Sequence, residues 1–158
     1  MIATIITVGG LGSSCMGTIE DAFRADPKCK VLSAGAWDGY KANLEGIIKA
    51  NPSPVVAAIG HSFAGIPILK LIEKGLLQYA GLIDPVSCKW FCSSYPMPSV
   101  HPKFYWCRRS MPGIERMMDI PGAGEPEIVQ GWHNGIPHSQ EVVSRLQTDI
   151  ADIIQAAS

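Results

Sequence analysis

The chain has 158 residues, of which 47% are hydrophobic and 17% are charged. This size supports one compact domain with a buried core and is too small for two. Thirteen Lys and Arg residues stand against fourteen Asp and Glu residues, which gives a net charge of −1. A near-neutral chain lacks the basic surface that binds nucleic acid or an anionic membrane, so both partners are disfavoured.

The N-terminal apolar run and the cysteines indicate the compartment. Residues 2–8 are apolar, but the run stops at Gly9 and no basic segment precedes it. It is therefore too short for a membrane span and unlike a signal peptide. Five cysteines are an odd number and too sparse for a disulfide scaffold. We therefore expect a soluble, cytoplasmic protein without a membrane span.

The first half of the chain alternates short apolar runs with segments of helical period, which is typical of parallel strands joined by helices. Strands are predicted at residues 2–8, 31–35, 55–60 and 79–84. The segments between them share apolar helical faces: Met16, Ile19 and Phe23, then Tyr40, Leu44, Ile47 and Ile48, then Ile68, Leu69, Leu71 and Ile72. Right-handed crossovers bring all four carboxyl ends to one sheet edge, where open α/β folds bind ligands.

The second half of the chain changes composition between residues 85 and 126. This stretch holds seven of the twelve prolines, three of the five cysteines and four of the six methionines, so little regular structure is expected there. Residues 104–109 are compatible with a strand, and residues 127–132 favour one. After the N-cap Ser139 comes a predicted closing helix, whose apolar stripe is formed by Val142, Leu146, Ile150 and Ile153.

These elements predict a fold of the α/β class. We expect one domain over residues 1–158, with residues 85–126 as an irregular insertion rich in proline, cysteine and aromatic residues. Its sheet should be mostly parallel, with about five or six strands and helices on both faces.

Residues 55–65 carry the sharpest chemical signal, a buried strand that passes through a Gly-x-Ser-x-small turn into a helix. This is the context of a nucleophile elbow. The strained turn brings the backbones on either side of the serine together, so it needs small residues, and Gly60 and Ala64 satisfy this. Ser62 is therefore the candidate nucleophile. The competing interpretation is an ordinary connection in which Ser62 caps the helix.

Residues 60–65, GHSFAG, resemble the Gly-His-Ser-x-Gly-Gly motif of the α/β-hydrolase superfamily, with Ala64 in place of a glycine. Residues 8–14, VGGLGSS, resemble that superfamily's His-Gly-x-Gly oxyanion loop, without its histidine. The resemblance implies that the backbone N–H groups of Leu11 and Phe63 bind the oxyanion. A phosphate loop is disfavoured, because the glycines do not form Gly-x-Gly-x-x-Gly and no Gly-Lys-Ser/Thr follows.

A serine hydroxyl needs a base to become a nucleophile. His133 follows the last predicted strand, where the superfamily carries its base, and residues 133–142 resemble the His-x-x-Ile-Pro stretch of small lipase-like proteins of bacteria and phages. His138 is the competing base. We expect His61, next to the serine, to be a structural residue of the turn.

The base needs an acid that orients it. Asp84 ends the predicted strand at 79–84 and so lies on the same sheet edge as Ser62. The competing interpretation of Asp84 is a structural turn with Pro85. Many superfamily members take the acid from a later strand, which leaves Asp119 as a rival.

The insertion holds four soft ligands within twenty residues: Cys88, Cys92, His101 and Cys107. They do not form the close pairs at both ends that structural zinc sites have. A disulfide of Cys88 with Cys92 or Cys107 is an alternative under oxidising conditions. A third interpretation is an apolar wall beside the active site, formed with Trp90, Phe91, Tyr95, Phe104, Tyr105 and Trp106.

The resemblance implies a minimal α/β-hydrolase that cleaves small carboxylic esters with Ser62, His133 and Asp84 and that needs no cofactor. Two other classes stay open. One is an inactive hydrolase-like protein that binds a ligand or partner. The other is a small zinc-stabilised interaction module built on residues 85–126.

Overall fold

The fold is a layered α/β structure. The computed structural model describes the whole chain except residues 1, 11–14, 35–42, 88–93, 112 and 114–115. Its central sheet has six strands in the order β2-β1-β3-β4-β6-β8, and every neighbouring pair is parallel. The strands are β1 (Ala3–Val8), β2 (Cys29–Ser33), β3 (Val55–His61), β4 (Tyr79–Ile83), β6 (Lys103–Arg109) and β8 (Glu127–Val129). The predicted α/β class is confirmed.

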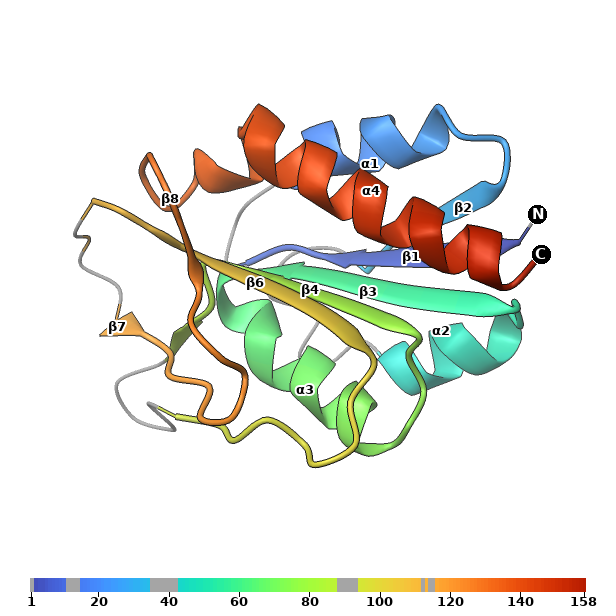
Figure 1. The fold of residues 1–158 in the computed structure, drawn as a ribbon, viewed down its shortest axis with the longest axis horizontal. Coiled ribbons are helices and arrows are strands. Elements are labelled where there is room, and N and C mark those ends of the chain that lie inside the picture. The colour runs from blue at the N-terminus through green and yellow to red at the C-terminus, as the bar shows by residue number, and fades with distance from the viewer. Residues whose placement is uncertain (1, 11–14, 35–42, 88–93, 112, 114–115) are drawn as a thin grey trace.

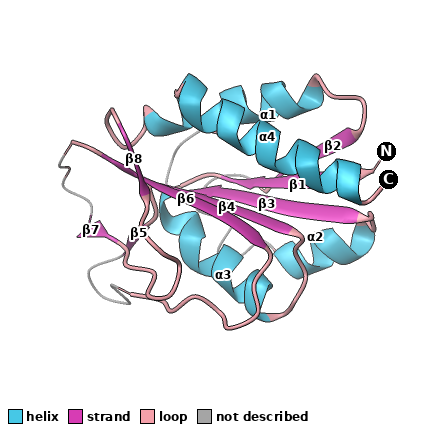
Figure 2. Cartoon of the chain, in the orientation of Figure 1, coloured by secondary structure: helices cyan, strands magenta, loops and turns pink. Residues whose placement is uncertain are grey.

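Helices cover both faces of the sheet, which forms the middle layer in Figure 2. The helices α1 (Gly17–Arg24) and α4 (Gln140–Ala156) lie on one face, and α2 (Leu44–Ala50) and α3 (Gly65–Glu73) lie on the other (Figure 1). Within the described ranges, no helix combines the length and the apolar character that a membrane crossing requires.

The side chains of strand β1 show why helices cover both faces of the sheet. Its side chains alternate, so Ala3 and Ile5 join the core under α1 and α4, while Ile6 and Val8 join the core under α2 and α3. All six residues of the strand are buried. An uninterrupted apolar run is therefore the pattern of a parallel strand between two helical layers.

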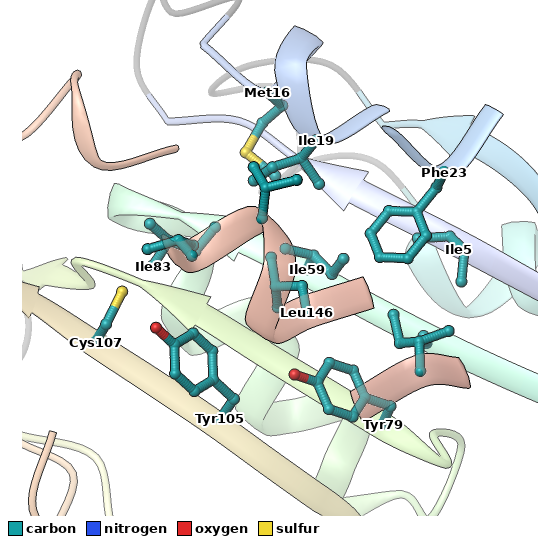
Figure 3. Close-up of a cluster of buried hydrophobic side chains, with 14 of the residues drawn as sticks. Ile5, Met16, Ile19, Phe23, Ile59, Tyr79, Ile83, Tyr105, Cys107 and Leu146 are labelled. Carbon is teal, nitrogen blue, oxygen red and sulfur yellow. The ribbon is translucent and has the colours of Figure 1, made fainter. Parts of the chain in front are cut away.

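The core under α1 and α4 is drawn in Figure 3, where Phe23 lies near Ile5 and Leu146 lies over the sheet beside Ile59. The helix α4 comes very close to the sheet. A Cβ atom at Gly81 of β4 would lie 2.8 Å from Leu146 Cδ2, so this strand position has no room for a side chain.

The segment predicted as irregular contains little regular structure apart from β6. Besides that strand, its described part holds a two-stranded antiparallel sheet of β5 (Val86–Ser87) and β7 (Arg116–Met117). The strand β6 is an inner strand between β4 and β8. Residues 85–126 therefore supply part of the sheet as well as a loop.

Two predicted strand boundaries and one predicted buried position differ in the structure. The strand predicted at 127–132 ends at Val129, because Gly131 has a φ of 142° and turns the chain away. The strand predicted at 31–35 begins earlier, at Cys29. In α4 the buried residue of the last turn is Ile154, and Ile153 is only half-buried. Tyr40, predicted on the face of the second helix, is outside the described residues.

Candidate active site

Five strands end at one edge of the sheet, and residues at or just after these ends form the candidate site. Gly10 follows β1, Ser62 follows β3, Asp84 follows β4, Arg109 ends β6, and His133 comes four residues after β8. The parallel pairing of these strands places their carboxyl ends together. Residues far apart in the chain can therefore form one site here.

Ser62 lies in a strained turn between β3 and α3. It begins the short 3-10 helix Ser62–Ala64, and its φ is 61°. Among the described non-glycine residues, the only other one with a positive φ is Asp84, at 42°. Such values are uncommon for residues with a side chain and cluster at functional sites.

The turn depends on small neighbours. A Cβ atom at Gly60 would lie 2.8 Å from Ala64 Cβ and 2.4 Å from Ile68 Cδ1, so no larger residue fits. A Cβ atom at Gly10 would lie 2.5 Å from Ser62 Cβ. Gly10 therefore lies directly against Ser62, which fits the oxyanion-loop interpretation of residues 8–14.

Ser62, His133 and Asp84 form a continuous chain of hydrogen bonds. His133 Nε2 lies 2.8 Å from Ser62 Oγ, and His133 Nδ1 lies 2.5 Å from Asp84 Oδ2. A carboxylate only accepts hydrogen bonds, so we assign the ring proton to Nδ1, which leaves Nε2 to accept from the serine hydroxyl. The three residues chosen from the sequence are thus brought together in the order that proton transfer from serine needs.

Asp84 is completely buried, and three donors hold its carboxylate. Besides His133, the backbone N–H of Arg109 lies 3.2 Å from Oδ1, and the guanidinium Nη1 of Arg109 lies 3.0 Å from Oδ2. The side chain of Arg109 is also fully buried. A buried charge needs such partners, since an isolated one is costly away from water.

The side chain of His61 forms a hydrogen bond with the backbone of His133. Its Nε2 donates to the carbonyl oxygen of His133 at 2.9 Å, and the two rings are 4.4 Å apart. Its Nδ1 then accepts from the thiol of Cys15, whose Sγ lies 3.1 Å away. Burial, and secondarily the nearby His133, lower the pKa of His61 to about 4, so the ring is neutral near pH 7.

The rival acid and the rival base lie elsewhere. The side chain of Asp119 is 72% exposed and forms an ion pair with Arg108 at 2.8 Å. His138 is exposed, and its Nδ1 lies 2.6 Å from Thr18 Oγ1. Neither group belongs to the hydrogen-bonded chain that begins at Ser62.

The oxyanion donors predicted from the resemblance are only partly described. Phe63 is the second residue of the 3-10 helix that Ser62 begins. Leu11 is outside the described residues, so its N–H group stays a prediction.

The predicted soft ligands do not form a described site. Cys88 and Cys92 are outside the described residues. His101 is exposed before β6 begins, whereas Cys107 is fully buried in β6. No group of three or more His, Cys, Asp or Glu side chains suited to a metal occurs in the described part of the chain.

The predicted aromatic wall is wrong for the residues of β6. Tyr105 packs under α4, while Phe104 and Trp106 pack on the opposite face, because neighbouring side chains of a strand alternate. These rings fill the two cores. Trp90 and Phe91 are outside the described residues.

Sequence reasoning missed Arg109. The signal was present, because Tyr105, Cys107 and Arg109 occupy alternate positions of the predicted strand and so share a face. A charged residue in line with two core residues, at the carboxyl end of a strand, indicates a buried charge that requires a partner.

The fold and the site together define an α/β protein with a hydrogen-bonded Ser-His-Asp chain at the carboxyl edge of a parallel sheet. Comparison with protein-family models and with curated protein sequences finds no match for this chain.

Proposed function

We propose that the protein is a serine hydrolase with a minimal α/β-hydrolase fold, which cleaves small carboxylic esters through an acyl-enzyme. Ser62 is the nucleophile, His133 is the general base, and Asp84 orients His133. The observation that carries this proposal is the unbroken hydrogen-bonded chain from Ser62 Oγ to Asp84 Oδ2, at 2.8 Å and 2.5 Å, with Ser62 at a positive φ.

The first half of the reaction acylates Ser62. As Oγ bonds to the ester carbonyl carbon, its proton moves to His133 Nε2, and the carbonyl π electrons move onto oxygen. Asp84 stabilises the imidazolium, and the N–H groups of Phe63 and Leu11 bind the oxyanion. The intermediate then collapses, the ester C–O bond breaks, and the alcohol leaves with the proton from Nε2.

The second half releases the acid. Water attacks the acyl carbon while His133 takes one of its protons, and Ser62 leaves after Nε2 returns that proton to Oγ. Acyl transfer of this kind uses side chains and water and is neutral in electrons, so the proposal includes no cofactor. We expect the substrate to be a small ester. The odd number and low density of cysteines support a cytoplasmic location.

A fluorophosphonate probe tests the proposal, since it phosphonylates activated serines. The matched control for Ser62→Ala is Ser144→Ala, an exposed serine on α4. We expect labelling and aryl-ester hydrolysis in the wild type and in Ser144→Ala, and a loss of turnover up to ~10⁶-fold in Ser62→Ala.

Two results would overturn the proposal. One is a folded wild-type protein that neither reacts with the probe nor hydrolyses an aryl ester, which would favour a ligand-binding role. The other is hydrolysis that survives in Ser62→Ala.

A further inference from the structure

Asp84 has an ionic partner that the proposed reaction does not use. Its Oδ2 atom accepts from His133 Nδ1 at 2.5 Å and from the guanidinium of Arg109 at 3.0 Å. Its Oδ1 atom accepts from the backbone N–H of Arg109 at 3.2 Å. Arg109 therefore binds both oxygens of the carboxylate, and the side chains of Asp84 and Arg109 are both 0% exposed.

We propose that Arg109 is a positioning residue of the active site: it fixes the Asp84 carboxylate with Oδ2 toward His133 and balances its charge. This inference rests on the proposed function. Arg109 binds Asp84, and Asp84 in turn binds His133, so we assign Arg109 a positioning role behind the pair of Ser62 and His133.

The first argument is orientational. A free aspartate side chain rotates about two bonds, and Asp84 follows β4 in a left-handed backbone conformation, with φ 42°. Two donors from one residue, a guanidinium and a backbone N–H, hold both oxygens at once, and such two-point binding sets direction as well as energy. The direction of Oδ2 then fixes the ring of His133.

The second argument is electrostatic. Without a cation, burial would penalise the charge of Asp84. Arg109 supplies a permanent positive charge, since arginine stays protonated in proteins. The guanidinium and the ring of His133 bind the same oxygen, Oδ2, so the charge of Arg109 acts on the Asp84–His133 pair.

Among the described residues, the titratable groups near this cluster include His133, His61, Cys15 and Cys107, and Tyr105 and Glu127 act on Cys107. The pKa of His61 is lowered to about 4, first by burial and then by His133, so that ring is neutral above this pH. Burial raises the pKa of Cys107 to about 12, so its thiol is neutral as well. The charge of Arg109 is therefore a main electrostatic influence on the Asp84–His133 pair near neutral pH.

The test compares Arg109 with the preceding arginine of the same strand. Arg108 pairs with the exposed Asp119 and lies over the ring of Trp106, 4.8 Å from its centroid. The variants are Arg109→Gln and Arg109→Lys, with Arg108→Gln and Arg108→Lys as matched controls. The measurements are kcat and KM for an aryl ester between about pH 5 and 9, and the Tm.

For Arg109→Gln we expect kcat to fall about 10²-fold, with KM changed less than about twofold. The acid limb of its pH profile should move up by about one pH unit, because loss of the positive charge makes His133 easier to protonate. Arg109→Lys keeps the charge and the backbone N–H and loses the planar guanidinium, so its kcat should fall by about tenfold or less and its acid limb should stay. A purely structural arginine would change Tm and leave the pH profile in place.

A folded Arg109→Gln protein decides the question. If its kcat stays within about threefold of Arg108→Gln and its acid limb does not move, the inference is wrong. If Arg109→Gln does not fold, Arg109→Lys decides: a kcat below that of Arg108→Lys at equal KM and Tm supports the inference, and a wild-type kcat overturns it.

The failure of this inference differs from the failure of the proposed function. A wild-type protein without hydrolysis that depends on Ser62 would remove the proposed function and the inference together. Hydrolysis that depends on Ser62 and is indifferent to Arg109 would remove only the inference.

Discussion

Asp84 and Asp149 are both buried aspartates, but their surroundings differ. Asp84 is 0% exposed, has a φ of 42° after β4, and faces His133 and a fully buried arginine. Asp149 is 5% exposed within the regular helix α4. Its partners are the hydroxyl of Tyr79 and two cations that reach solvent, Lys103 and Arg145.

The difference separates a candidate reactive site from a packing contact. Around Asp84, backbone strain, a fully buried ion pair and an imidazole coincide, and strain persists only where the surrounding structure enforces it. Around Asp149, a relaxed helix is tied to the sheet by Lys103 of β6 and by the phenol of Tyr79 of β4. Burial, and then Asp149, raise the pKa of that phenol. Burial of a carboxylate alone does not identify a site, whereas its partners do.

The largest expected effect on kcat comes from His133, the proposed base beside Asp84. His133→Ala should lower kcat by up to ~10⁶-fold, because it removes Nε2, the proposed proton acceptor 2.8 Å from Ser62 Oγ. His138→Ala is the matched control, since that ring lies against Thr18, and it should retain kcat. Aryl-ester kinetics measure both variants, and a loss in His138→Ala alone would reassign the base.

The next effect compares the two aspartates directly. Asp84→Asn should lower kcat by about 10⁴-fold, since an amide favours the wrong imidazole tautomer. It should also lower Tm, because Arg109 is left as an uncompensated buried charge. Asp149→Asn should lower Tm and change kcat less than about threefold.

Asp119→Asn should leave kcat unchanged and alter Tm little, since the side chain of Asp119 is 72% exposed and solvent weakens its ion pair with Arg108. The same kinetics and thermal unfolding measure all three variants. A large loss of kcat in Asp119→Asn with an active Asp84→Asn protein would move the acid to Asp119.

The third effect is a pH dependence of the free energy of unfolding that comes from His61, whose ring lies 4.4 Å from that of His133. The pKa of His61 falls from the ordinary 6.5 to about 4 on folding. Between these values the unfolded chain binds a proton that the folded protein does not. This contribution is therefore fully present above about pH 6.5 and is lost as the pH falls toward 4, by up to about 3 kcal/mol.

Urea unfolding of the wild type and of His61→Gln at several pH values measures this contribution. Glutamine can still donate to the carbonyl of His133 but does not titrate. The free energy of unfolding should therefore fall less steeply with acid in the variant. Equal slopes in the two proteins would show that His61 binds its proton equally well in both states.

The smallest effect lies in the Asp149 region. Tyr79→Phe removes the hydroxyl that donates to Asp149 at 3.2 Å and keeps the ring in the core. The free energy of unfolding should fall by about 1 kcal/mol, the usual net value of one hydrogen bond. The kcat should not change. Thermal unfolding and aryl-ester kinetics check this, and a loss of activity would mean that the two regions are coupled.

Much of the fold was predictable because parallel sheets leave a strong local pattern. The runs at β1, β3 and β4 are apolar because helices cover both faces, and each ends at a residue that turns the chain. Ser62 and Asp84 follow the ends of β3 and β4, and His133 comes four residues after β8, so local patterns were enough to select them. Their hydrogen bonds, however, became visible only in the folded structure.

The remaining features depend on contacts that no local pattern encodes. The bond from His61 to the carbonyl of His133 joins residues 72 positions apart, and the pair of Asp84 and Arg109 joins residues 25 apart. The end of β8 was predicted too late because Gly131, with its φ of 142°, was not recognised as the turn. Such effects of tertiary geometry override short-range preference.

The distance along the chain between Ser62 and His133 has a consequence for synthesis. The two residues are 71 positions apart, and β8, which precedes His133, pairs only with β6 among the described strands. Domains fold as units during translation, and contacts of long sequence separation form late. Under the proposed function, a ribosome-bound chain that has not yet emerged as far as residue 133 lacks the base for Ser62, so we expect it to have no hydrolase activity until the segment with His133 docks.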